Sequence, residues 1–375
     1  KERLESAGLF GYTDATTVVE GWVRTKQVPE LGNLLNAATG GRHILSIYDP
    51  RPSEVEAVPV ELRNPNVVKD FEYVTGLYGL PRYDEIDPTP ILAFTFALFF
   101  GITLADVGYG IAIVAFMASG VWLAKVFSPT LRRMMVLCGI FTIIAGLLVG
   151  GWFGFGQGLW VNPIQRPVPL LKLVIFIGIA HLLVAFGFAG ALKDVFRRDW
   201  RSLVFGRMSA ILVIVGFFGL SFSALGIGLY EFGINYAFPK MEIFTVFNPL
   251  APAVIIVQLF RILFYLGLGL GVVGAALTAK EVKGRIGWSL SVLYSVIGYI
   301  SDVASYTRLL AICVAGGVIA FSINLILGLM YGGVKSLPAP IAILLTAGLV
   351  FIFIAAHSFN IFINSLGGFI HTMRL

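Results

Sequence analysis

The stretch "GWSLSVLYSVIGYISDVASYTRLLAICVAGGVIAFSINLILGLM" (287–330) is an apolar run in which the charged residues are Asp302 and Arg308. At about 1.5 Å per residue, a helix of this length would reach roughly 66 Å, about twice the hydrocarbon thickness of a bilayer. The sequence therefore predicts a long helix that is strongly tilted or protrudes from the membrane. Arg308 lies near its midpoint, too far from either end to reach water easily.

The composition of the whole chain indicates a membrane protein. Of its 375 residues, 57% are hydrophobic and 13% are charged, and the mean hydropathy is +0.87. These values exceed those of soluble domains. The net charge of +6 is then explained by basic cytoplasmic loops rather than by nucleic-acid binding. Cys138 and Cys313 both lie in apolar runs, which favours neither a disulfide nor a metal site.

Beyond residue 88 the sequence contains further apolar runs that are each long enough to cross a bilayer. The runs cover 89–124, 131–152, 169–192, 203–230, 251–279, 287–330 and 339–375. Lys and Arg gather in the loops after the first, third and fifth runs, which predicts that these loops are cytoplasmic. They comprise Lys125, Arg132 and Arg133; Lys193, Arg197, Arg198 and Arg201; and Lys280, Lys283 and Arg285.

The first apolar run is predicted to be a hairpin, because it must enter and leave on the cytoplasmic side. The break is expected within "GITLADVGYG" (101–110), where glycines loosen the helix and Asp106 needs a polar partner. We therefore expect an all-α polytopic membrane protein of about eight transmembrane helices, the last two long and tilted. The predicted spans are 89–104, 106–124, 131–152, 169–192, 203–230, 251–279, 287–330 and 339–375.

Residues 1–88 differ from the rest of the chain and are predicted to be a water-facing, cytoplasmic segment. Acidic residues outnumber basic ones, and the segment is rich in proline between residues 48 and 65. A strand is expected at 16–23 and a short helix from Pro29 to Ala38. The favoured interpretation is the end of a larger α+β soluble domain. Because the chain begins at Lys1 with no signal peptide, we expect a preceding portion.

Two polar stripes accompany Arg308. His357, Asn360, Asn364, His371 and Arg374 are separated by 3, 4, 7 and 3 residues, which places them along one face of the last helix. Ser301 and Ser305 precede Arg308 at matching steps. Facing polar stripes predict a water-accessible path, although a single intramembrane Asn or His is more often a helix-to-helix hydrogen bond.

An internal ion pair is the structural alternative for Arg308. An arginine at membrane depth costs about 2.5–3.5 kcal/mol on insertion scales and cannot deprotonate, so it needs a counter-charge or a function. Asp302 is six residues away and does not share its helical face. Asp106 could pair with Arg308, form a structural hydrogen bond, or line a channel.

The remaining signals are interpreted as structural. "GLGVVG" (269–274) lies in an apolar span without a preceding strand, so helix packing is favoured over a nucleotide site. His181 is expected to form an interhelical hydrogen bond. Arg261, near the outer end of the fifth run, is expected to snorkel towards lipid headgroups.

Several motifs resemble a known family. "SYTRL" (305–309) followed by "HTMRL" (371–375) is similar to the two arginine motifs in the membrane half of the stator subunit of V-type and archaeal-type ATPases, called subunit a or subunit I. "EGWV" (20–23), "YGLPRYDEIDPTP" (78–90) and "FFGITLADVGYG" (99–110) resemble the same family in order. The likeness covers nearly the whole chain.

This resemblance implies a non-catalytic, ion-translocating subunit of a rotary ATPase or ATP synthase, without a nucleotide site or cofactor. The implied partners are a proteolipid c-ring, peripheral stalk subunits, the central-stalk cap subunit and membrane lipid, with no nucleic acid. Arg308 and Arg374 would act in ion translocation. Half-channels would be lined by the polar residues already described, which are His357, Asn360, Asn364, His371, Ser301, Asp302, Ser305 and Asp106.

The chain also departs from the family pattern. Eukaryotic members have His eight positions after the first arginine and Glu ten positions before the second, where this sequence has Gly316 and Asn364. These simpler positions indicate a bacterial or archaeal cell-membrane protein. The alternative function is an autonomous transporter or channel in which Arg308 binds an anionic substrate.

Overall fold

The computed structural model describes residues 11–12, 16–51, 53–156, 158–278 and 282–375. The chain separates into two compact units, one made of Lys1–Arg63 and Gly76–Asp87 and the other of Asn64–Thr75 and Pro88–Leu375. Every residue predicted to take part in ion translocation belongs to the second unit. Residues 1–10 of the water-facing segment and Lys280 of the third basic loop lie outside the described residues.

In its described residues, the first unit combines a small strand pair with the helix α2 and the end of α4. β1 (Gly11–Tyr12) pairs with β2 (Thr17–Val18) in an antiparallel ladder, and the short turn η1 (Thr25–Gln27) leads into α2 (Val28–Thr39). Gly40 ends α2 in the left-handed conformation, which glycine adopts without strain. The predicted short helix is confirmed, whereas the predicted strand is reduced to two residues.

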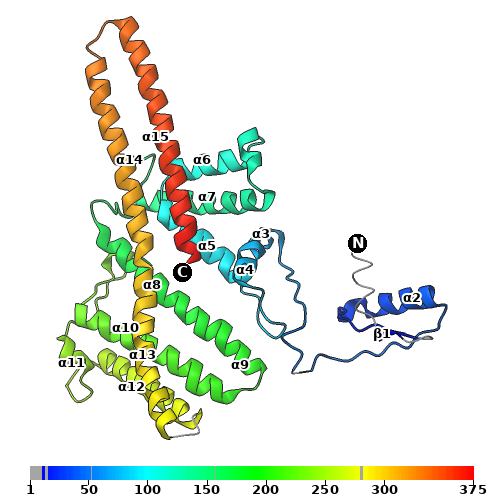
Figure 1. Cartoon of the computed structure of the whole chain (residues 1–375). Helices are drawn as coiled ribbons and strands as arrows, with labels where there is room; N and C mark the ends of the chain where they lie inside the picture. The colour runs from blue at the N-terminus through cyan, green and yellow to red at the C-terminus, as the bar shows by residue number, and fades with distance from the viewer. Residues whose placement is uncertain (1–10, 13–15, 52, 157, 279–281) are drawn as a thin grey trace. The chain divides into compact units, whose positions relative to one another are not determined.

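The second unit is helical along most of its length (Figure 1). It begins with α3 (Asn66–Lys69) and the start of α4 (Glu72–Tyr78), and continues with α5 (Thr89–Leu104), α6 (Val107–Ala118), η2 (Trp122–Val126), α7 (Pro129–Val149), α8 (Pro167–Leu183), η3 (Val184–Ala191), α9 (Leu192–Phe196), η4 (Ser202–Met208), α10 (Ser209–Leu225), η5 (Tyr230–Phe232), α11 (Ile243–Phe247), α12 (Ile255–Thr278), α13 (Val282–Ser305), α14 (Thr307–Val334) and α15 (Ala339–Met373).

Six helical segments in the described residues are long and apolar enough to cross a membrane. They are Pro129–Val149, Pro167–Phe196, Ser202–Leu225, Ile255–Leu277, Leu290–Val334 and Ala339–Met373. α5 and α6 are apolar but shorter. The all-α polytopic architecture is confirmed, and the count of eight spans stays a prediction.

A sharp break separates α5 from α6. Ala105 has a φ of 37°, and Asp106 caps α6 by accepting a hydrogen bond from the backbone N–H of Tyr109 at 3.0 Å. Both helices pack on α7, where glycines allow close contact. The break falls within the stretch 101–110, where the sequence predicts a hairpin.

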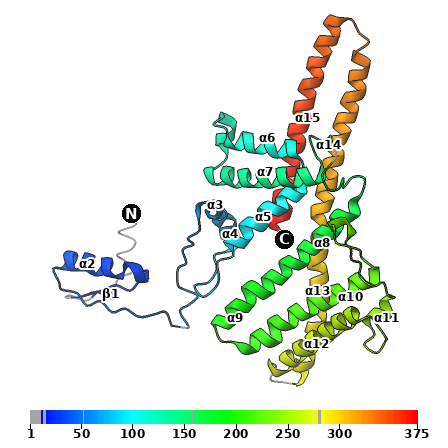
Figure 2. The same ribbon diagram turned by 180° about the vertical axis from the view of Figure 1, so that it is seen from behind.

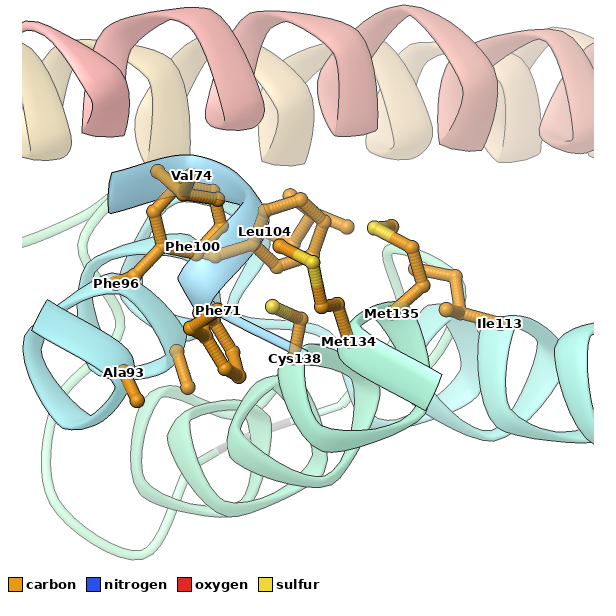
Figure 3. Packing of buried hydrophobic residues seen from close by; sticks show 11 residues of the cluster. Phe71, Val74, Ala93, Phe96, Phe100, Leu104, Ile113, Met134, Met135 and Cys138 are labelled. Carbon is orange, nitrogen blue, oxygen red and sulfur yellow. The ribbon is translucent and has the colours of Figure 1, made fainter. Parts of the chain in front are cut away.

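Segment 64–75 is packed into the membrane unit through an apolar cluster between α5 and α7 (Figure 3). Phe71 and Val74 are 0% and 1% exposed and contact buried residues of both helices. Asp70 receives two hydrogen bonds from the Arg133 guanidinium, at 2.5 and 2.7 Å. Such a bidentate pair fixes orientation as well as distance, so this segment is joined to the start of α7 by both apolar and ionic contacts.

α10 and α12 pack together, and their loops are held by a buried cation. Arg261 of α12 is 2% exposed and donates hydrogen bonds to the carbonyl oxygens of Val246 at 2.7 Å, Ala251 at 2.5 Å and Thr245. The expectation that Arg261 snorkels is therefore wrong. Its guanidinium binds carbonyl groups left free by the irregular backbone around α11.

The long C-terminal helices lie side by side in both views, coloured orange and red (Figures 1 and 2). The predicted 287–330 helix largely coincides with the candidate span Leu290–Val334 and is interrupted at one residue, because Tyr306 separates α13 from α14. α15 has 35 residues and would reach about 52 Å, well beyond the thickness of the hydrocarbon layer. Polar side chains gather where α14 and α15 meet α6.

Candidate functional site

The last helix places three polar side chains in the protein interior. His357 and Asn360 are each 2% exposed, and Asn364 is 7% exposed. Their spacing of 3 and 4 residues puts them on one face of α15, as the sequence predicts. Because buried polar groups are costly without partners, each must find hydrogen bonds on the neighbouring helices.

Tyr109 of α6 is the centre of these bonds. Its hydroxyl lies 2.8 Å from His357 Nδ1 and accepts a hydrogen bond from Asn360 Nδ2 at 2.8 Å. His357 Nε2 lies 3.1 Å from Asn324 Oδ1 on α14. The network therefore joins α6, α14 and α15 in the interior of the membrane unit.

Asparagines extend the network in both directions. Asn324 Nδ2 donates to the carbonyl oxygen of Phe153 at 2.5 Å. Asn360 Nδ2 also donates to the Gly316 carbonyl at 3.2 Å. Asn364 Nδ2 donates to Asn360 Oδ1 at 2.6 Å. A continuous series of polar contacts thus runs from the loop after α7 to the middle of α15.

Asp106 organises the loop at one end of this network. It is 5% exposed, and its carboxylate accepts three backbone hydrogen bonds, from Tyr109 and Phe153 to Oδ1 and from Gly154 to Oδ2, at 2.9–3.0 Å. Of the roles left open for Asp106, the structural hydrogen bond is present. Gly154 has a φ of 76°, and an added Cβ would lie 2.6 Å from the Ala320 carbonyl carbon, so the loop touches α14 closely.

A cavity of about 50 Å³, bordered by several polar side chains among apolar and glycine residues, lies between this loop and α14. Its lining includes Asp106, Tyr109, Asn162, Gly316 and Asn364. A cavity needs roughly 10–15 Å³ to hold one water molecule, so this one has room for a few. Both Asp106 and Asn364, which the sequence predicts to be channel-lining, border it.

Arg308 lies at the start of α14, immediately after the helix interruption. Its Nε donates to the Ser305 carbonyl at 3.0 Å, and the residue is half-buried. The ion pairs found in the described part of the chain do not include Arg308. The internal ion pair with Asp302 or Asp106 is therefore absent from this structure, and Asp106 is already bonded to backbone N–H groups.

The end of α15 is level with Arg308. Gly316 faces Asn364 and Asn324 faces His357, and the same antiparallel register places Arg308 level with residues 372–373. The Nδ1 of His371 and the hydroxyls of Thr372 and Ser365 are buried and have no hydrogen-bond partner within the described residues. Buried polar atoms of this kind are usually satisfied by water.

Four predicted residues lie outside the buried network. Ser301, Asp302 and Arg374 are exposed. The Ser305 hydroxyl donates to the Ser301 carbonyl at 2.9 Å. The polar stripe of α15 thus faces Gly316 and Asn324 rather than Ser301 and Ser305. Neither Arg374 nor Arg308 forms an ion pair with a described residue.

The sequence interpretation missed two members of the network. Asn324 is a lone amide within the apolar run 287–330, a pattern typical of an interhelical hydrogen bond. Tyr109 is part of the quoted stretch 101–110, but nothing in its local spacing shows that it meets residues 248 and 251 positions later. His181 was expected to form an interhelical bond, and its Nδ1 lies 2.5 Å from the Tyr306 hydroxyl.

Comparison with known proteins identifies relatives of the chain. Residues 8–160 match the V-type ATPase 116kDa subunit family. The chain is 30% identical over 377 residues to the A-type ATP synthase subunit I of Pyrococcus horikoshii, covering 97% of this chain and 51% of that protein. The chain is 31% identical over 415 residues to the A-type ATP synthase subunit I of Methanocaldococcus jannaschii. This match covers 100% of the chain and 54% of that protein.

These matches confirm the resemblance found in the motifs. The chain is similar to subunit I along nearly its whole length. It spans about half the length of the curated relatives it matches.

Proposed function

We propose that this relative of A-type ATP synthase subunit I is the stationary, ion-conducting membrane subunit of a rotary ATPase or ATP synthase. The observation that carries the proposal is Arg308, a half-buried guanidinium without an ion-pair partner in the described residues. A charge that costs about 2.5–3.5 kcal/mol to insert requires a counter-charge. We assign that counter-charge to a carboxylate on a rotating proteolipid ring.

The electrostatic role of Arg308 follows from its permanent charge. A fixed cation favours the ionised form of a nearby carboxylate, whereas the same carboxylate facing lipid must be neutral. A ring carboxylate that reaches Arg308 therefore releases its proton and is reprotonated before it returns to lipid. Because Arg308 cannot lose its own proton, it also separates the two water-accessible routes.

The polar network supplies one of these routes. The cavity beside Asp106, Asn162 and Asn364 is lined by the loop after α7, which the sequence places on the outer side of the membrane. From there, polar contacts lead through Tyr109 to His357 and Asn360. We assign this path to the outer half-channel. His357 and His371 are available as proton-relay groups, which favours H⁺ as the transported ion.

The end of α15 supplies the other route. Ser365, His371 and Thr372 present buried polar atoms that have no partner in the described part of the chain, and the antiparallel register of α14 and α15 puts Thr372 level with Arg308. Water bound to them would connect the ring carboxylate with the cytoplasmic side. We assign Arg374, Ser301, Asp302 and Ser305, which are exposed or half-buried, to the side that meets the ring.

The proposed partners and location follow from this role. The membrane unit would contact the c-ring and lipid in an archaeal-type cell membrane. The 1–88 segment would continue into a cytoplasmic domain that holds peripheral stalk subunits and the central-stalk cap subunit.

ATP-driven proton pumping tests the proposal. We would measure it in vesicles that contain the assembled complex with Arg308→Gln, and use Arg201→Gln, an exposed arginine of the cytoplasmic loop, as the matched control. Loss of pumping with assembly intact is the expected result for Arg308→Gln alone. Undiminished pumping would refute the role of Arg308, and anion transport by the chain alone in liposomes would support the autonomous transporter instead.

A further inference from the structure

The helix that carries Arg308 is interrupted two residues before it. The N–H of Tyr306 bonds to the Val303 carbonyl at 3.1 Å, and the N–H of Leu309 bonds to the Tyr306 carbonyl at 2.9 Å. Both are bonds between residues three apart, tighter than the four-residue step of an α-helix. The direction in which Arg308 leaves the backbone is therefore set by a local turn at Tyr306.

Side-chain contacts hold this turn against α8 and α5. Tyr306 is 4% exposed, and its hydroxyl lies 2.5 Å from His181 Nδ1. Its ring forms an edge contact with Phe99, with centroids 5.6 Å apart. A Cβ added to Gly178 would lie 2.7 Å from the ring, so the ring has no room to shift towards α8.

The turn also binds the guanidinium of Arg308. Thr307 Oγ1 donates to the Ala304 carbonyl at 2.7 Å, and Arg308 Nε donates to the Ser305 carbonyl at 3.0 Å. Both carbonyls lie at the end of α13, where the interruption removes their helical partners. One nitrogen of Arg308 is thus fixed to the backbone, while its terminal nitrogens make no hydrogen bond to the described residues and can meet a carboxylate.

We propose that His181 and Tyr306 are positioning residues for Arg308: their hydrogen bond fixes the α13 to α14 turn and thereby aims the guanidinium at the ring. This inference rests on the proposed function of Arg308. A merely structural pair would hold α8 to α13 without affecting how tightly proton flow is coupled to ATP hydrolysis.

The test compares variants in the assembled complex in vesicles. Tyr306→Phe removes the hydroxyl and keeps the ring. His181→Leu removes the hydrogen-bonding partner of the Tyr306 hydroxyl, whereas His181→Asn keeps a polar side-chain amide near the position of Nδ1. Tyr299→Phe is the matched control, because this ring forms a similar edge contact with Phe186 at 5.5 Å and the structure shows no hydrogen bond from its hydroxyl to the described residues. Arg308→Gln is measured in parallel.

The measured quantity is the number of protons pumped per ATP hydrolysed, with the thermal midpoint of the complex as the control for structure. We expect Tyr306→Phe and His181→Leu each to lower this ratio by about tenfold, since small displacements of a reacting group have large effects. The double variant Tyr306→Phe/His181→Leu should lower the ratio of protons to ATP no further than either single substitution does. His181→Asn should recover the ratio, and Tyr299→Phe should leave it unchanged.

Two outcomes would overturn the inference, and they are distinguishable. If Arg308→Gln abolishes pumping while Tyr306→Phe and His181→Leu leave the ratio unchanged, the positioning role fails and the proposed function stands. If Arg308→Gln itself pumps normally, the proposed function fails first. If the complex with Tyr306→Phe does not assemble, His181→Leu is compared with His181→Asn instead. An equal number of protons pumped per ATP for these two variants would overturn the inference.

Discussion

Gly316 of α14 and Asn364 of α15 face each other so closely that a Cβ on Gly316 would lie 2.8 Å from Asn364 Oδ1. These are the positions where eukaryotic members of the resembled family carry His and Glu. The two departures from the family pattern are therefore spatial neighbours. Both border the cavity beside Asp106, and a glycine at 316 leaves space for the Asn364 amide.

Gly316→Ala should destabilise the complex by about 1–3 kcal/mol, because the added methyl group overpacks this contact. Asn364→Ala should relieve part of that cost, so the effects of the two substitutions will not add. The stability of the two single variants and the double variant is compared by the unfolding midpoint of the detergent-solubilised complex. Strict additivity in the double variant would show that the two positions do not interact.

Asp106→Asn should cost about 1–3 kcal/mol, although it changes one atom. The replacement can still accept from Tyr109 and Phe153, but either its new N–H₂ group or the Gly154 N–H is left facing another donor. Asp302→Asn, at an exposed carboxylate, is the matched control for stability. Equal unfolding midpoints for the two variants would contradict the role of Asp106 in holding the loop.

Tyr109→Phe should slow proton pumping several-fold while the complex still assembles. The substitution keeps the ring, which contacts Phe153 and His357, but removes the hydroxyl that bonds to His357 and Asn360. Tyr331→Phe, at an exposed tyrosine of α14, should pump normally. If both variants pump at the wild-type rate, the outer half-channel does not pass through Tyr109.

Arg261→Met should lower stability by about 3 kcal/mol or more. It removes the donor for three backbone carbonyls in a buried site, and each unsatisfied buried acceptor costs about 1–3 kcal/mol. Arg166→Met, at an exposed arginine, should have little effect. A wild-type unfolding midpoint for Arg261→Met would mean that water replaces the guanidinium.

Acid should weaken the contact between η5 and α8. The hydrogen bond from Lys172 Nζ, 2.8 Å from the Glu231 carboxylate, holds the pKa of Glu231 below its ordinary value, aided by a backbone bond and the charge of Lys172. The folded state thus binds this proton less tightly than the unfolded chain. The stabilisation is complete above the ordinary pKa of about 4.3 and is lost as the pH falls through it towards the lower folded value.

The measurement is the unfolding midpoint between pH 3 and pH 7, compared with that of Glu231→Gln. The advantage of the wild-type complex over this variant should begin to shrink below about pH 5 and should disappear as the pH falls through the ordinary pKa of about 4.3 towards the lower folded value. Glu242→Gln, an exposed carboxylate in the same loop, is the control. A constant difference between wild type and Glu231→Gln across this range would show that the ion pair is not linked to stability.

The sequence alone determined that this is an all-α membrane protein and that Arg308 is its candidate functional charge. Long apolar runs require helices, because backbone N–H and C=O groups have no other partners in lipid. A permanent cation inside such a run stands out because its insertion is costly. The 3 and 4 residue spacing of His357, Asn360 and Asn364 also predicts their common face, which the structure confirms.

Only the tertiary structure decided what those side chains meet. Tyr109, Asn324 and His357 are far apart in the chain, so their contacts depend on how three helices pack. The interruption at Tyr306 could not be predicted for the same reason, since the local sequence is compatible with a continuous helix. His181, which bonds to the Tyr306 hydroxyl, and Gly178, which leaves space for the Tyr306 ring, both belong to α8. Hydropathy and residue spacing do not specify the turn at Tyr306 that these contacts accompany.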